Sequence, residues 1–553
     1  MRLCHDSVTI VSEVIKMKRK MVIRIMALVL AGVLAFGSNV MEARADDAPQ
    51  IEKDLRPIKD AVCEKMGEDT IVGAACTKDE LSRNAIQELI EHHFNAVTFG
   101  NELKPDALFG YSNGKVPGTH EDELNGKTIV VPNMDFSRAE YMCDIIKKWN
   151  DENPDNIIKI RGHVLVWHSQ TPEWFFHVDY DKSKDYVSPE EMNVRLEWYI
   201  REVLTHFTGE DSKYKGMFYG WDVVNEAISD GSHSYRSDSE NPSESLLKDT
   251  HGSNSSWWHV YESNEFIINA FRFANKYAPK DLDLYYNDYN DDSIPKQIGI
   301  VNLINAVKEA DGTRIDGMGM QGHYNSTKMN EGDFEICAKK YLETGVKVMI
   351  TEWDMKASDS YDADDEKSVV TEYTREANRY KTLYNKMLDL KAEGYDIAGF
   401  TFWGTIDKFS WLQTTSGMGG GSTSGKPHCP LLFDDDYKAK PAYWAFVDDS
   451  HILDMMNEYK AKAKAEEEKE TEASVEEVND TSVEAVSSEE ADEAVSEETI
   501  LLEDDLKAGE EKPHRRSTPM IIATCAVLAA IVLAASIFAQ KRAEKRGPKK
   551  KKD

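Results

Sequence analysis

A repeated alternation of β-rich runs and amphipathic runs constrains the fold of this chain more than any other feature. Eight short runs of mostly apolar residues predict strands at 71–75, 95–99, 158–167, 217–225, 282–288, 315–321, 346–351 and 397–403. Apolar residues near helical spacing predict helices at 81–94, 266–277, 298–310, 333–343 and 368–392. Strand and helix alternating eight times over about 400 residues predict an α/β fold, a closed parallel (β/α)8 barrel.

A doubly wound open sheet is the alternative for such a pattern. Its usual mark is a glycine-rich phosphate loop between a strand and a helix. No predicted strand is followed by such a loop, so we predict a TIM barrel over residues 46–457. In this fold the chemistry lies at the carboxyl ends of the strands, and most of the distinctive residues of this chain fall there.

The N-terminal segment has the composition of an export signal. A basic stretch precedes the apolar run 25–36, and small residues at 43–45 offer a cleavage position. Residues 1–45 are therefore predicted to be a signal peptide, with Met17 and Met21 as alternative starts. A retained membrane anchor is the other interpretation of this segment.

The C-terminal part departs from the barrel pattern. Twenty acidic residues and five lysines lie between 461 and 512, which predicts a disordered acidic spacer at 458–516, with a charged helix as the alternative. Residues 517–540 include twenty consecutive uncharged residues and predict one transmembrane helix. The basic segment 541–553 then predicts a cytoplasmic tail. The protein is thus predicted to be secreted, with the lipid bilayer as a partner and the barrel outside the cell.

Charge and cysteine usage limit the possible partners. The net charge of −33 argues against a nucleic-acid partner. The seven cysteines form no CxxC pair and no Cys/His spacing typical of zinc, so no metal site is predicted. Cys63 and Cys76 could form a disulfide, but buried free thiols are the favoured interpretation.

Two predicted strands lead to a carboxylic acid. Asn225 and Glu226 close the run at 217–225, and Glu352 follows the run at 346–351, 126 residues further along the chain. Cleavage of a glycosidic bond needs one protonated carboxyl group and one ionised carboxylate in different environments. Either Glu alone would be read as a solvent-facing strand end, but together they predict a catalytic pair.

Other strand ends carry side chains suited to sugars, whose hydroxyl groups need hydrogen bonds and whose C–H faces need aromatic rings. His323 ends the strand before that of Glu352 and is expected to bond Glu352 on one side and Asp354 on the other. Taken singly, His323 could instead be a buried core histidine, and Lys104 could be an ordinary surface lysine. The remaining candidates are Asn101, Lys104, His163, Trp167, Gln170, Trp403 and Trp411.

These blocks resemble the glycoside hydrolase family 10 endo-β-1,4-xylanases. The matching stretches, in the expected order, are 93–105, 162–172, 221–227, 287–290, 315–324, 351–354, 401–412, 431–433 and 440–443. The resemblance implies retaining hydrolysis of xylan through a covalent glycosyl-enzyme, with Glu226 as acid/base, Glu352 as nucleophile and no cofactor. It implies a separation of about 5–5.5 Å between the two carboxyl groups.

By position, the resemblance also assigns supporting roles. It places Asn225, His163, Gln321 and His323 around the bond that is cut. It places the glycone-binding groups at Asn101, Lys104, Trp167, Gln170, Trp403 and Trp411.

The chain departs from the family pattern in three places. Gly100 stands where many members have a sugar-contacting Glu, and Trp353 replaces a smaller apolar residue. A long segment at 231–263 either extends the cleft on the aglycone side or is a disordered insertion, and 416–426 is predicted to be a flexible loop. The alternatives for function are a β-1,4-glucanase or cellulase of the same fold, or a non-catalytic surface glycan-binding protein.

Overall fold

The protein is described here by a computed structural model. It describes residues 51–454 except 113, 238–254 and 414–426, and beyond residue 454 only 457 and 461. The predicted export signal, transmembrane helix and tail lie outside the described residues, as do the predicted spacer apart from residue 461 and the predicted loop at 416–426. Within the described part, no helix combines the length and apolarity that crossing a membrane requires.

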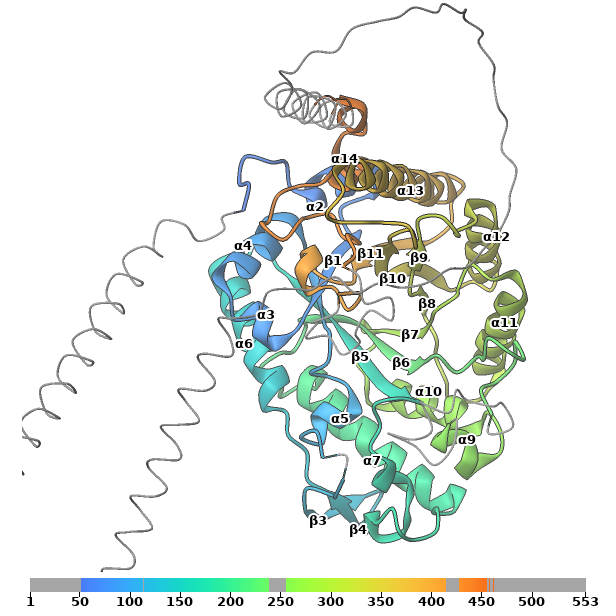
Figure 1. Cartoon of the computed structure of the whole chain (residues 1–553). Coiled ribbons are helices and arrows are strands. Elements are labelled where there is room, and N and C mark those ends of the chain that lie inside the picture. The colour runs from blue at the N-terminus through green and yellow to red at the C-terminus, as the bar shows by residue number, and fades with distance from the viewer. Residues whose placement is uncertain are drawn as a thin grey trace, which may run out of the picture. The chain divides into compact units, whose positions relative to one another are not determined.

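Eight parallel strands form a closed barrel (Figure 1). Neighbouring strands pair in parallel around the ring, and the pairing of Ile71 with Gly399 joins the last strand to the first. Every predicted strand is confirmed. The strands are β1 (Ile71–Cys76), β2 (Ala96–Phe99), β5 (Lys159–Trp167), β6 (Phe218–Asn225), β7 (Asp283–Asp288), β8 (Gly317–Met320), β10 (Lys347–Lys356) and β11 (Ile397–Phe402).

Helices surround the barrel (Figure 1). The five predicted helices are confirmed, although the first divides into α3 (Lys78–Leu81) and α4 (Asn84–His93). The others are α10 (Glu265–Tyr277), α11 (Ile294–Glu309), α12 (Glu331–Leu342) and α13 (Glu366–Ala392). The sequence interpretation missed α2 (Ile58–Met66), α6 (Ser137–Glu152), α7 (Pro189–Thr208), α14 (Pro441–Val447) and the short helices α5 (Pro105–Leu108) and α9 (Ser256–Tyr261).

Short strands and 3₁₀ turns lie in the loops between the barrel strands and the helices. An antiparallel hairpin joins β3 (Thr119–Leu124) to β4 (Lys127–Pro132), and β9 (His323–Asn325) pairs with the end of β10. This pairing explains why β10 runs beyond the predicted end at residue 351. Three 3₁₀ turns lie at Glu173–Phe176, Val178–Tyr180 and Asp407–Phe409.

The layer between strands and helices contains large aromatic side chains. Trp353 is fully buried and stacks on Phe402 at a centroid distance of 5.8 Å. It also packs against Tyr380 of α13 and Phe446 of α14. The indole of Trp353 therefore belongs to this outer core and not to the cleft at the carboxyl end of the barrel.

The barrel interior holds a buried charge. Arg161 of β5 has no solvent exposure, and its Nη1 donates to Oδ2 of Asp222 on β6 at 2.8 Å. Its Nη2 donates to the carbonyl oxygen of Thr351 on β10 at 2.7 Å. Because buried charges are costly unless they are paired, these bonds favour one arrangement of the three strands.

The five cysteines of the described part are all free thiols, so the disulfide considered for Cys63 and Cys76 is not formed. Four of the five are buried. Burial raises the pKa of the Cys76 thiol well above its usual range, which keeps this side chain neutral.

Candidate active site

A cleft of about 450 Å³ opens at the carboxyl ends of the strands. Most of the residues predicted from the sequence line it, and Asn101 and Asp354 lie directly behind residues that do. Tyr289 and Asn290 were not predicted as site residues. The lining residues are Lys104, His163, Trp167, Gln170, Asn225, Glu226, Tyr289, Asn290, Gln321, His323, Glu352, Trp403 and Trp411.

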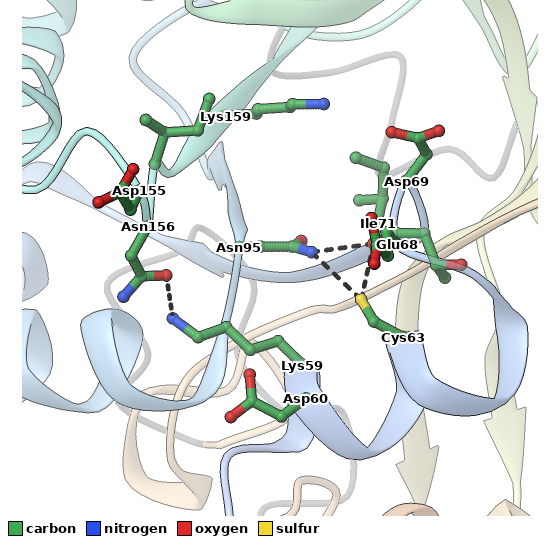
Figure 2. A pocket seen from close by; sticks show the side chains of 12 residues that line it. Lys59, Asp60, Cys63, Glu68, Asp69, Ile71, Asn95, Asp155, Asn156 and Lys159 are labelled. Atoms are coloured by element: carbon green, nitrogen blue, oxygen red, sulfur yellow. Dashed lines mark hydrogen bonds between the residues drawn. The ribbon is translucent and has the colours of Figure 1, made fainter.

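A second cavity, of about 340 Å³, lies at the amino ends of β1, β2 and β5 (Figure 2). Two of its polar side chains bond within the fold: Lys59 donates to Asn156 at 2.9 Å, and Asn95 donates to the carbonyl oxygen of Thr70 at 2.9 Å. No aromatic side chain is among the described residues that line it. The cleft at the opposite end of the barrel is therefore the better candidate for a sugar site.

Three neutral donors bond the carboxyl group of Glu226, and Nδ1 of His168 lies 3.8 Å from its Oε2. The indole nitrogen of Trp167 donates to Oε2 at 2.8 Å, while the amides of Gln321 and Asn225 donate to Oε1 at 2.9 and 3.1 Å. The backbone of Glu226 has a φ of 57°, a left-handed conformation that is uncommon outside glycine. The acid therefore sits in a fixed position at the end of β6.

Glu352 lies in a more enclosed and more cationic environment. Only 4% of the residue is exposed, Nδ2 of Asn287 donates to its Oε1 at 2.7 Å, and Nε2 of His323 lies 3.2 Å from its Oε2. On the far side of the imidazole, Nδ1 of His323 lies 3.0 Å from Oδ2 of Asp354. The structure thus contains the Glu352–His323–Asp354 arrangement that the sequence predicts.

Opposing effects set the charge of the Glu352 carboxyl group. Burial alone raises the pKa of Glu352, but the hydrogen bond from His323 and the electrostatic interactions with His163, His323 and Arg161 outweigh it and lower the pKa to about 2. Burial lowers the pKa of His323, but the negative charges of Asp354 and Glu352 raise it to about 10. At neutral pH, Glu352 is a carboxylate and His323 is an imidazolium.

The side-chain amide of Asn287 links Glu352 to Asn225, the residue that donates to Glu226. Nδ2 of Asn287, at the end of β7, donates to Glu352 and also to Oδ1 of Asn225 at 2.9 Å. The hydroxyl of Thr351 donates to Oδ1 of Asn287 at 2.5 Å, which fixes the orientation of the amide. Sequence reasoning missed Asn287 as a site residue, although an Asn at a strand end repeats the signal that identified Asn225.

One wall of the cleft combines aromatic rings with a buried cation. Lys104 is 5% exposed, donates to Oδ1 of Asn101 at 3.1 Å, and its Nζ lies 5.1 Å from the ring centroid of Trp167. Burial lowers the pKa of Lys104. Gln170 closes this wall through a 3.3 Å bond from Nε2 to Asp106.

Two further tryptophans lie near the histidines. Trp403 contacts His163 edge to face at a centroid distance of 5.4 Å. The indole nitrogen of Trp411 donates to Oδ2 of Asp354 at 2.6 Å. These contacts give the cleft apolar faces beside charged and amide groups, a combination that suits sugar rings.

The described parts of the insertion 231–263 pack on the barrel. Helix α9 carries the buried Trp257, whose ring lies edge to face with Phe176 at a centroid distance of 4.8 Å. Its indole nitrogen donates to the carbonyl oxygen of Trp167 at 3.1 Å. This end of the insertion therefore supports, from behind, the residue that contacts Glu226.

A (β/α)8 barrel with two carboxyl groups and an aromatic-lined cleft at the carboxyl ends of its strands is typical of a barrel glycoside hydrolase. The comparison with known families agrees with this class. The chain matches the model of glycosyl hydrolase family 10 over residues 60–449, and it belongs to that family.

Relatives of known name are similar over most of the barrel. The bifunctional endo-1,4-beta-xylanase XylA of Ruminococcus flavefaciens is 30% identical over 373 residues, 67% of this chain and 32% of that protein. The beta-1,4-xylanase of Dictyoglomus thermophilum is 31% identical over 378 residues, 68% of this chain and 87% of that protein. This chain spans only 28–35% of the length of several of the curated relatives it matches.

A solved structure supports the same fold. The CBM22-1–GH10 modules of the Clostridium thermocellum endo-1,4-beta-D-xylanase 10B, complexed with xylohexaose, are 27% identical with a TM-score of 0.56. The alignment covers 71% of this chain and 68% of that chain.

Replacing His323 by Asn should move the acidic limb of the activity profile. The substitution removes the hydrogen bond and charge that lower the pKa of Glu352 and leaves the burial that raises it, so this pKa should rise from about 2. Glu352 would then take up its proton at higher pH. We expect the acidic limb of the kcat/KM profile to shift upward by at least about one pH unit.

The control is His451→Asn, which changes a histidine whose side chain is 49% exposed and which lies outside the cleft. The pH dependence of kcat/KM, measured for both variants and the unchanged protein, checks the prediction. An acidic limb that stays in place in His323→Asn would show that His323 does not set the charge of Glu352.

Proposed function

We propose that the protein is an endo-β-1,4-xylanase that cleaves internal bonds of xylan with retention of anomeric configuration. One observation carries the proposal: two carboxyl groups share a sugar-sized cleft in different environments, with an ionised Glu352 beside His323 and a Glu226 whose carboxyl oxygens accept hydrogen bonds from the neutral side chains of Trp167 and Gln321. Retaining hydrolysis requires this division between a nucleophile and an acid.

The mechanism has two displacements. In the first, an oxygen of Glu352 attacks the anomeric carbon while the proton of Glu226 passes to the leaving glycosidic oxygen, which departs as the hydroxyl of the aglycone chain. In the second, Glu226 takes a proton from water, the water oxygen bonds to the anomeric carbon, and Glu352 leaves as a carboxylate.

Support for the substrate comes from the relatives and from the cleft. The named relatives are xylanases, and the solved C. thermocellum protein is a complex with xylohexaose. In this chain Trp403 and Trp411 bring indole rings next to His163 and His323. Because xylose lacks the hydroxymethyl group of glucose, the room beside these two rings is the feature that distinguishes a xylanase from a β-1,4-glucanase.

The full chain should release reducing sugar from xylan and little from carboxymethylcellulose. Glu352→Ala should lower activity on xylan by at least about 10⁴-fold, because the attacking oxygen is lost. A reducing-sugar assay on both polymers checks this, with Glu343→Ala as the control because Glu343 is a glutamate at the end of α12, outside the cleft.

Two outcomes would contradict the proposal. Preference for carboxymethylcellulose would assign the protein to the β-1,4-glucanases. Failure to cleave either polymer, together with binding of xylan in a pull-down, would indicate a surface glycan-binding protein on an enzyme fold.

We further propose that the enzyme is secreted and remains attached to the cell surface. The proposal rests on the basic and apolar segment before residue 46, the acidic segment 458–516, the uncharged run 520–539 and the basic tail after it. Attachment at the surface would keep the released oligosaccharides close to the cell.

Cell fractionation tests this attachment. The full chain should sediment with membranes, resist extraction by alkaline carbonate and dissolve in detergent, while a chain ending at residue 516 should enter the medium. The catalytic barrel should be accessible to protease added to intact cells. Recovery of the full chain in the medium, or protection of the barrel from protease, would refute the proposal.

A further inference from the structure

The chain leaves Glu226 and folds back to it ten residues later. Residues 227–236 form a tight hairpin in which the backbone nitrogen of Arg236 donates to the carbonyl oxygen of Ala227 at 2.7 Å. Ile228 and Tyr235 form an antiparallel bridge within it. This turn opens the long insertion that separates the chain from the usual family pattern, and it places the side chain of Arg236 beside the cleft.

The guanidinium group of Arg236 joins two parts of the site. Its Nε donates to the backbone carbonyl oxygen of Glu226 at 2.9 Å, and its Nη2 donates to the hydroxyl of Tyr289 at 3.2 Å. Tyr289 lines the cleft together with Glu226. One planar side chain therefore fixes the peptide of the acid and the neighbouring wall at the same time.

The backbone of Glu226 needs such support because its φ of 57° is unfavourable for a residue with a side chain. The nitrogen of Glu226 donates to the carbonyl oxygen of Asn287 at 2.9 Å. The nitrogens of Ala227 and Ile228 donate to the hydroxyl of Tyr286 at 3.0 and 3.1 Å. Arg236 satisfies the carbonyl oxygen, so the peptide groups on both sides of the strained residue are bonded.

Tyr289 is itself held by a second contact. Nζ of Lys296 lies 3.8 Å from the centroid of its ring. Lys296 is 1% exposed and is bonded to Asp230 at 2.8 Å and to Asp288 at 3.0 Å. Arg236 thus connects Glu226 to a wall that is rigid and not to a mobile surface side chain.

We propose that Arg236 is a positioning residue for the acid step. It holds the peptide of Glu226 in its left-handed conformation, and thereby directs the carboxyl proton at the leaving glycosidic oxygen. The proposal rests on the proposed function, in which Glu226 is the acid. A displacement of about 1 Å in a reacting group can cost about 10²-fold in rate, so loss of this support should be visible in kinetics.

Substrates with different leaving groups distinguish a positioning role of Arg236 from a purely structural role. A 2,4-dinitrophenyl β-xylobioside loses a stable phenolate and needs no proton, whereas a phenyl β-xylobioside depends on the acid. The ratio kcat/KM reports the steps up to the first irreversible bond cleavage, and so excludes the later hydrolysis in which Glu226 acts as base.

Arg236→Gln should lower kcat/KM on the phenyl xylobioside and on xylohexaose by at least about tenfold, and on the dinitrophenyl xylobioside by less than about threefold. Arg236→Lys keeps a cation able to donate one hydrogen bond and should recover part of the loss on the phenyl substrate. Arg314→Gln is the matched control, because Arg314 also binds a backbone carbonyl oxygen, that of Leu282 at 2.9 Å, near the amino end of β7.

Equal losses on the two xylobiosides, or no loss on either, would overturn the proposal. Melting temperatures of all variants are measured in parallel. If Arg236→Gln does not fold, Tyr289→Phe, which removes the hydroxyl that accepts from Arg236 and also interacts with Asp230, is tested in the same assays and should show the same leaving-group pattern at smaller size.

A failure of the proposed function gives a different result in these assays from a failure of the Arg236 proposal. Glu226→Gln should lose most of its kcat/KM on the phenyl xylobioside and keep most of its kcat/KM on the dinitrophenyl substrate. If Glu226→Gln keeps the full kcat/KM on both, Glu226 is not the acid, and the proposed function fails whatever the Arg236 variants do.

Discussion

The ionised carboxylate of Glu352 is the group on which the rest of the site depends. Burial disfavours its charge, so the fold must supply compensation, and it does so with the imidazolium of His323 and the amide of Asn287. His323 in turn keeps its proton because Asp354 lies on its other side. Trp411, which donates to Asp354, extends this chain of contacts to the aromatic wall.

The barrel brings these groups together because parallel strands end at the same face. Asn225 ends β6, Asn287 lies near the end of β7, Gln321 follows β8 and Glu352 lies in β10, so neighbouring strands place neighbouring side chains. Arg161 of β5 joins two of these strands, β6 and β10, through bonds to Asp222 and Thr351. The charge near Glu352 is therefore a property of the whole barrel and not of one loop.

Periodicity in the sequence was enough to predict the strands, because a strand buried on both faces reads as a continuous apolar run. Several outer elements were missed although their signals were present. Asn125-Gly126 is a strong two-residue hairpin signal between β3 and β4, and the buried residues of α6 recur at spacings of three and four. Charged residues between the apolar positions of α6 weaken that pattern.

The candidate site was predictable where a residue lies just after the end of a predicted strand, as with Glu226, Glu352 and His323. Side chains that reach the site through folding were not. Arg236 comes from a hairpin without any periodic signal, and only the return of the chain brings it to the carbonyl oxygen of Glu226. Trp257 reaches Trp167 from a helix 90 residues further along the chain. Such contacts depend on tertiary packing, which local patterns do not specify.

The central claim is that Glu352 forms a covalent bond with the substrate. The most direct test is to treat the protein with 2,4-dinitrophenyl 2-deoxy-2-fluoro-β-xylobioside, which slows hydrolysis of the intermediate, and to locate the label by peptide mass spectrometry. The account predicts one fluoroxylobiosyl group per chain, attached to Glu352. A label on another residue, or inactivation without any covalent label, would contradict it.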